Sequence, residues 1–101
     1  MEKEKIKKQL IESMSKLSSI RKLILFGSFI TEKQPHDIDL AVIDDRDNDY
    51  ITLSLSYRKA LRDISRIIPI DVFPIRSGQN NRDSMMLSEI ENGEVIYERR
   101  R

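Results

Sequence analysis

Two aspartates and a Gly-Ser pair are the residues of this chain best suited to chemistry. Asp37 and Asp39 stand one residue apart within an apolar run, and Gly27-Ser28 ends the apolar run before it. Residues two positions apart on a strand project from the same face of a sheet, so the two carboxylates would lie side by side. Magnesium prefers such carboxylate oxygens. The spacing therefore predicts a magnesium site on one strand.

A third carboxylate and a phosphate-binding turn extend this prediction. Asp71 lies in an apolar strand-like run, where an acid without a counter-charge is costly. Gly27 allows close backbone approach to a ligand, and the Ser28 hydroxyl and the amides that follow can donate to a phosphate. Lys33 could neutralise a leaving pyrophosphate. Since two magnesium ions held by carboxylates suit nucleotidyl transfer, the pattern favours chemistry on a nucleoside triphosphate.

The elements that must position these residues follow from periodicity and turn signals. We predict helices over about 2–19, 50–67 and 83–92, strands over 22–26, 37–43, 70–75 and 94–98, and polar loops over 44–49 and 76–82. Ile38, Leu40 and Val42 face one way on their strand, and Asp37 and Asp39 face the other. The order α-β-β-α-β-α-β predicts an α/β (α+β) domain, with one mixed four-stranded sheet and helices on at least one face.

The helix predicted over 50–67 has two different sides. Its core side carries Tyr50, Leu53, Tyr57, Ala60, Leu61, Ile64 and Ile68, and its other side carries Arg58, Arg62 and Arg66. Ile51 and Leu55 lie beside the arginines. A solvated face or a docking surface for an acidic partner would both fit this pattern, and homo- or hetero-oligomers stay open.

Composition narrows the class of protein. The 101 residues fit one domain over 1–101, and 35% charged and 39% hydrophobic residues are typical of a globular chain. A net charge of +1 gives no overall field toward nucleic acid or membrane. The absence of cysteine excludes disulfides and thiolate metal sites. With no signal-peptide core and no apolar run of about 18 residues, we expect a cytoplasmic protein.

A Gly-Ser pair, a short loop, Asp-x-Asp and a distant strand aspartate resemble the DNA polymerase β-like nucleotidyltransferase superfamily. The small size and the ending Ile90-Glu-Asn-Gly-Glu-Val-Ile-Tyr97 resemble its small branch, the minimal nucleotidyltransferases (MNT). The resemblance covers residues 23–97. It implies that Asp37 and Asp39 bind two Mg²⁺ ions and that Ser28 holds the triphosphate. Asp71 would bind the catalytic ion and help to deprotonate the acceptor hydroxyl.

The same resemblance implies a partner and a role. Members of this branch are often encoded beside a HEPN-domain toxin, typically an RNase, and act as its antitoxin. Some transfer AMP from ATP to a tyrosine of that toxin. We therefore expect an Mg²⁺-dependent transferase with ATP as substrate and a HEPN toxin as acceptor.

The segment between Ser28 and Asp37 departs from the family pattern. It is shorter by a residue or two, and Phe29 and Ile30 stand where an arginine and a glycine commonly follow the Gly-Ser pair. Both changes affect the grip on the triphosphate more than metal binding. Two alternatives stay open: an antitoxin that acts by binding alone, and transfer to RNA or a small molecule. Near-neutral charge and the lack of an aromatic stacking platform argue against RNA.

Overall fold

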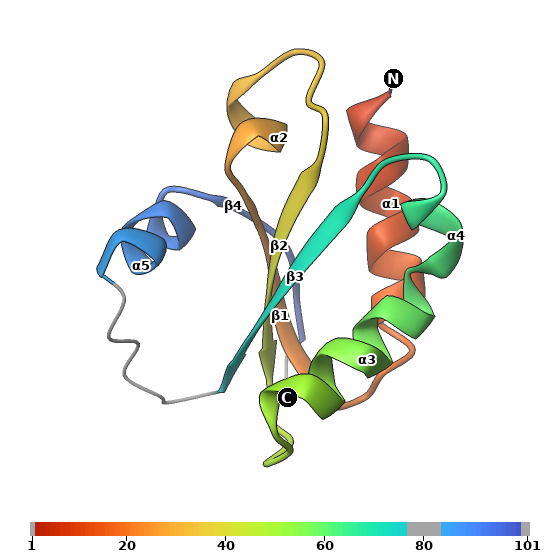
Figure 1. Ribbon diagram of the computed structural model, residues 1–101, viewed down its shortest axis with the longest axis vertical. Coiled ribbons are helices and arrows are strands. Elements are labelled where there is room, and N and C mark those ends of the chain that lie inside the picture. The colour runs from red at the N-terminus through yellow and green to blue at the C-terminus, as the bar shows by residue number, and fades with distance from the viewer. Residues whose placement is uncertain (1, 77–83, 100–101) are drawn as a thin grey trace.

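The computed structural model describes residues 2–76 and 84–99. Its elements run in the order α1 (Lys3–Met14), β1 (Ile20–Phe26), α2 (Ser28–Thr31), β2 (Ile38–Asp44), α3 (Tyr50–Ala60), α4 (Arg62–Ser65), β3 (Ile70–Arg76), α5 (Ser84–Glu91) and β4 (Glu94–Glu98) (Figure 1). Most of the loop predicted over 76–82, and the end of the arginine tail, lie outside the described residues. No helix within the described ranges is long and apolar enough to span a membrane.

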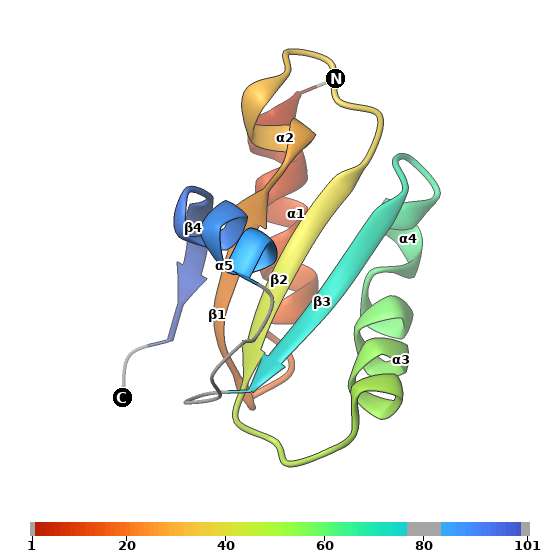
Figure 2. The same cartoon turned by 60° about the vertical axis from the view of Figure 1, so that its left-hand side comes forward.

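The four strands form one mixed sheet in the order β3-β2-β1-β4 (Figure 2). β1 pairs antiparallel with both β2 and β4, whereas β2 and β3 run parallel. The parallel pair needs a crossover, which α3 and α4 supply. The predicted α+β fold with a four-stranded mixed sheet is confirmed.

Helices cover both faces of this sheet, but unequally. α1, α3 and α4 lie on one side and α5 on the other (Figure 1). The first side holds the main core, to which β2 contributes Ile38, Leu40 and Val42, as predicted. The second side holds a smaller cluster in which Ile90 of α5 joins Ile24, Phe26 and Ala41. Because strand side chains alternate, Asp39 lies on the α5 side of the sheet.

The helices differ from the predicted ones in three places. α1 ends at Met14 rather than near 19, because Ile20 is drawn into β1 opposite Asp44. The helix predicted over 50–67 is broken at Leu61, whose backbone (φ −98°, ψ 10°) leaves the helical region. Tyr50 was placed on the core side, but it is 57% exposed, since it begins α3 beyond the edge of the main core.

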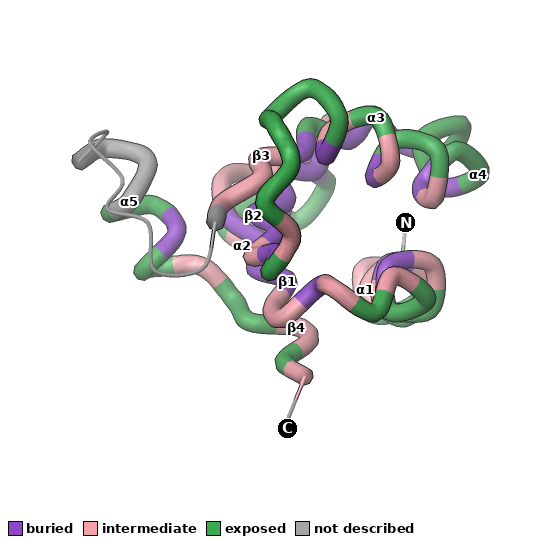
Figure 3. Tube along the Cα trace, turned by 90° about the horizontal axis from the view of Figure 1, so that it is seen from below, coloured by how far each residue is buried: buried purple, intermediate pink, exposed green. Residues whose placement is uncertain are grey.

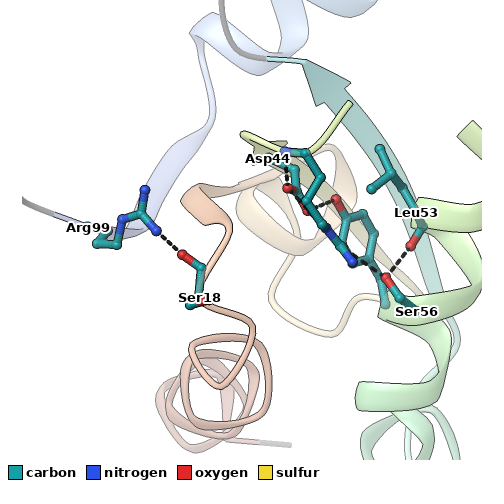
Figure 4. Close-up of polar contacts among 7 residues, drawn as sticks. Ser18, Asp44, Leu53, Ser56 and Arg99 are labelled. Carbon is teal, nitrogen blue, oxygen red and sulfur yellow. Dashed lines mark hydrogen bonds and ion pairs between the residues drawn. The ribbon is translucent and has the colours of Figure 1, made fainter. Parts of the chain in front are cut away.

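Asp44 was predicted to open a polar loop over 44–49, but it is the last residue of β2 and is buried. Asp44 is only 1% exposed and accepts hydrogen bonds from the Tyr57 hydroxyl (2.7 Å) and Arg46 Nη2 (2.9 Å). Arg46 also donates to Ser56 Oγ (3.1 Å), which donates to the Leu53 carbonyl (2.8 Å; Figure 4). This network ties the end of β2 to α3, because a buried carboxylate must be paired.

The net effect of this network is to lower the pKa of Asp44. Burial alone pushes the pKa up, but the hydrogen bonds from Arg46 and Tyr57 outweigh it. Near the same end of the sheet, Arg99 donates to the Ser18 carbonyl (Figure 4). Arg99 also donates to Asp45 Oδ2 (2.8 Å), and the two contacts fasten the end of β4. The loop prediction missed this structural acid because the tyrosine that buries it lies 13 residues further on.

Candidate nucleotidyl-transfer site

The candidate site lies at the end of the sheet where β1 ends and β2 and β3 begin. In the sheet register, Phe26 of β1 stands opposite Asp39 of β2, and Asp39 stands opposite Asp71 of β3. Directly opposite residues of neighbouring strands share a face, so the Asp39 and Asp71 side chains are lateral neighbours. The structure thus brings together two acids that are distant in the sequence.

Gly27 is fitted closely against Asp39. It follows β1, stands immediately before the short helix α2 and has φ +72° and ψ −149°, a conformation that side chains strongly disfavour. A Cβ atom placed on Gly27 would stand 2.4 Å from Asp39 Oδ2, so any larger residue would collide with the carboxylate. The group that the Gly27 backbone approaches in the structure is therefore Asp39, an acid of the candidate site, and the approach of Gly27 to a ligand stays a prediction.

Ser28 and Asp37 form the other contact of this turn. The Ser28 hydroxyl donates to Asp37 Oδ1 over 3.0 Å, and both residues are half-buried. Asp37 lies one residue before β2, where it precedes the strand instead of opening it as predicted. Ser28 begins α2, a helix of four residues that was not predicted from the sequence. This turn of helix forms because the backbone amides of Ile30 and Thr31 donate hydrogen bonds to the Gly27 carbonyl.

Three neighbouring acids act on Asp39, and their charges disfavour its ionised form. Burial raises the pKa of the Asp39 carboxyl, and the negative charges of Asp37 and Asp71 raise it further. Glu89 of α5 contributes to the same rise. The sequence analysis missed Glu89. Its neighbour Ile90 is apolar and packs α5 on this face of the sheet, and that position could have indicated that Glu89 lies near the acids. The site therefore carries excess negative charge that a cation would relieve.

The donor set fits magnesium in chemistry, since it consists of carboxylate oxygens on one face. Within the described ranges, however, no three His, Cys, Asp or Glu side chains stand close enough together to hold a metal ion as they are. Asp71 is exposed and Asp39 half-buried, so the side chains would have to turn toward a shared ion. Asp37, Asp39 and Asp71 would be the residues to hold it.

The remaining predicted residue, Lys33, lies in the loop between α2 and β2 and is exposed. Phe29, which follows the Gly-Ser pair, is 1% exposed and belongs to the main core. Lys3 of α1 stands over the Phe29 ring, 5.5 Å from its centroid, and donates to the Glu32 carbonyl. Phe29 thus fixes the turn to the core, and Lys3 holds it from outside.

A small mixed sheet, with acids at the starts of adjacent strands and a Gly-Ser turn beside them, is the arrangement expected of a nucleotidyltransferase-type domain. The comparison with protein families agrees: the chain belongs to the family described as Polymerase beta, Nucleotidyltransferase, which it matches over residues 8–101. This match confirms the resemblance to the polymerase β-like superfamily. A comparison with curated proteins gave no significant match.

Solved structures with the same fold come from toxin–antitoxin complexes. One is the complex of a tri-AMPylated HEPN toxin with an MNT antitoxin from Shewanella oneidensis, with a TM-score of 0.64, 18% identity, and coverage of 97% of this chain and 74% of that one. The MntA–HepT toxin–antitoxin gives 0.66 at 16% identity, covering 95% and 73%. A toxin–antitoxin with AMP-PNP gives 0.68 at 18%, covering 92% and 73%. At these identities the likeness shows a shared fold.

Proposed function

We propose that this chain is an Mg²⁺-dependent nucleotidyltransferase that moves AMP from ATP to a tyrosine hydroxyl of a HEPN-type toxin. It acts in the cytoplasm as the antitoxin of that partner. The observation that carries the proposal is the register of β2 and β3, which pairs Asp39 with Asp71 on the face where a Cβ atom on Gly27 would collide with the Asp39 carboxylate. The family and the AMPylated complex with the same fold support it.

In the proposed reaction, the acceptor hydroxyl oxygen bonds to the α-phosphorus of ATP, the bond to the β-phosphate breaks, and pyrophosphate leaves. Asp71, the most exposed of the three aspartates, would take the hydroxyl proton. Ser28 would donate to the triphosphate after release from Asp37, and Lys33 would neutralise the leaving pyrophosphate. Bound magnesium would supply positive charge at the phosphates.

A second function, neutralisation of the partner by binding alone, is favoured by one specific observation. Phe29 occupies the position after Gly27-Ser28 at which an arginine is common in the resembling family, and its side chain is buried in the main core. The turn thus offers no cation at this position to hold a triphosphate. A weak grip on ATP would leave a protein of this fold that binds its partner without modifying it.

The two functions separate in a transfer assay. The protein is incubated with the HEPN protein encoded beside its gene, Mg²⁺ and α-labelled ATP. We expect label on the partner, and no label with Asp39→Asn. Lys33→Met should reduce labelling while leaving complex formation intact. A tight complex that carries no label would refute the transferase and support binding alone, and label on co-purified RNA would move the acceptor to nucleic acid.

A further inference from the structure

The outward side of α3 carries an apolar patch that the fold does not use. Ile51 is 70% exposed and Leu55 is 62% exposed, one helical turn apart on the same stripe. Single exposed apolar residues are ordinary, but two at this spacing form a continuous surface. The loop before α3 and the start of the helix are exposed as well (Figure 3).

Charges flank this patch with opposite sign at its two ends. Asp47 and Asp49 precede the helix, and Asp49 caps α3 by accepting from the Thr52 amide (2.7 Å). Arg58 and Lys59 lie in the last turn, and both are exposed. A surface that is acidic at one end, apolar in the middle and basic at the other is complementary to itself when turned by 180°.

We propose that α3 is the contact surface of a symmetric dimer with a second copy of this chain. Two α3 helices packed antiparallel about a two-fold axis near position 53 bring Ile51 of each copy against Leu55 of the other. The same arrangement brings Arg58 of each copy to the acidic segment 47–49 of the other. Such a two-fold contact is the commonest form of homo-oligomer, and each residue pair in it occurs twice.

The free sheet edges fit a second copy less well. On β4, Val95 is 50% exposed, but an antiparallel pairing of two β4 strands would set Glu94 against Glu98, and like charges directly opposite are destabilising. On β3, Pro74 lacks the amide hydrogen that an added strand would need. Among these three surfaces, α3 alone offers apolar area with matched charges.

The position of α3 leaves the candidate site open. α3 lies on the side of the sheet opposite α5, whereas Asp39 lies on the α5 side (Figures 1 and 3). A dimer through α3 would therefore expose both sites outward, and it does not depend on whether nucleotide transfer occurs. An 11-residue helix is about 16 Å long, so the contact falls in the small class of interfaces and should depend on concentration.

Sedimentation velocity of the full chain, from about 5 to 500 μM, tests the proposal. We expect the weight-average mass to rise from monomer toward dimer across this range. Leu55→Glu and Ile51→Glu should each keep the protein monomeric with an unchanged circular dichroism spectrum. The matched control is Ile67→Glu, which alters a residue 64% exposed but outside the patch and should leave the dimer intact.

Charge reversal provides a second test at the rim of the contact. Arg58→Glu should weaken the dimer about five-fold or more, because it sets like charges against the acidic segment of the other copy. Arg66→Glu, an equal change of net charge outside the contact, should leave the dissociation constant within two-fold. Either a monomer at every concentration or a dimer that survives both Leu55→Glu and Ile51→Glu would overturn the proposal.

Discussion

Replacing Gly27 with alanine should lower the free energy of unfolding by about 2–4 kcal/mol, from two separate causes. The first is the backbone: φ +72° with ψ −149° is a region in which a residue with a side chain costs about 1–3 kcal/mol. The second is the collision of the new Cβ with Asp39 Oδ2, which would stand 2.4 Å away. For a domain of this size, each kcal/mol lowers the melting temperature by about 4 °C.

A double-mutant cycle separates these two causes. In Asp39→Ala the colliding oxygen is gone, and the nearest remaining Asp39 atom in the structure, Cβ, lies 3.6 Å from the built position, an ordinary contact. Gly27→Ala should therefore lower the free energy of unfolding by at least about 1 kcal/mol less in the Asp39→Ala background than in the wild type. The matched control is Asp37→Ala, in which the full cost should persist because the nearest built contacts all belong to Asp39.

Urea unfolding followed by circular dichroism measures each corner of this cycle. Equal costs of Gly27→Ala in the wild type and in Asp39→Ala would refute the placement of the carboxylate against the glycine. A reduced cost in Asp37→Ala as well would show that the effect belongs to the acidic cluster as a whole and not to one contact.

Three further predictions follow from the pKa shifts and the buried network. Because burial and neighbouring acids raise the pKa of Asp39, ionisation of this carboxyl disfavours the folded state. In thermal melts at pH 7 without metal, Asp39→Asn should therefore raise the free energy of unfolding by about 0.2–1 kcal/mol, and a loss of stability would contradict the raised pKa. Added MgCl₂ should raise the melting temperature of the wild type more than that of Asp39→Asn, and equal shifts would argue against Asp39 as a ligand. Tyr57→Phe removes the 2.7 Å hydrogen bond to Asp44 and should lower the free energy of unfolding by about 1.5–3 kcal/mol in urea unfolding. Because the pKa of Asp44 is lowered in the folded state, the stabilisation from this bond is present above the unfolded-state pKa near 3.9 and is lost as pH falls through the folded-state pKa. The stability deficit of Tyr57→Phe should therefore shrink in acid, and a deficit that grows in acid would contradict the lowered pKa of Asp44.

Much of the fold could be predicted because its signals are local. The alternation of Ile38, Leu40 and Val42 identified β2 and its buried face. The break at Leu61 and the early end of α1 were missed, since both depend on how the helices meet the sheet. A helical period continues in a sequence even where tertiary packing ends the helix.

The candidate site divides in the same way. Asp37, Asp39 and Asp71 could be proposed from spacing and from the cost of an acid in an apolar run, and the register then set Asp39 beside Asp71. The close packing of Gly27 against Asp39 depends on the order of the strands, and the proximity of Glu89 to Asp39 depends on where α5 packs on the sheet. The spacing of residues in the sequence gives neither of these arrangements. Asp44 has the same residue type as the others, and only its contacts distinguish a structural acid from a chemical one.

The most direct test of the central claim is the intact mass of the HEPN partner after co-expression with this protein. If the proposed transfer occurs, the partner should gain the mass of one or more AMP groups when it is co-expressed with the wild type and none when it is co-expressed with Asp39→Asn. The wild type and the Asp39→Asn variant should both still bind the partner. A partner of unmodified mass in a stable complex with the wild type, or an equal gain with Asp39→Asn, would contradict the assignment of this site to nucleotidyl transfer.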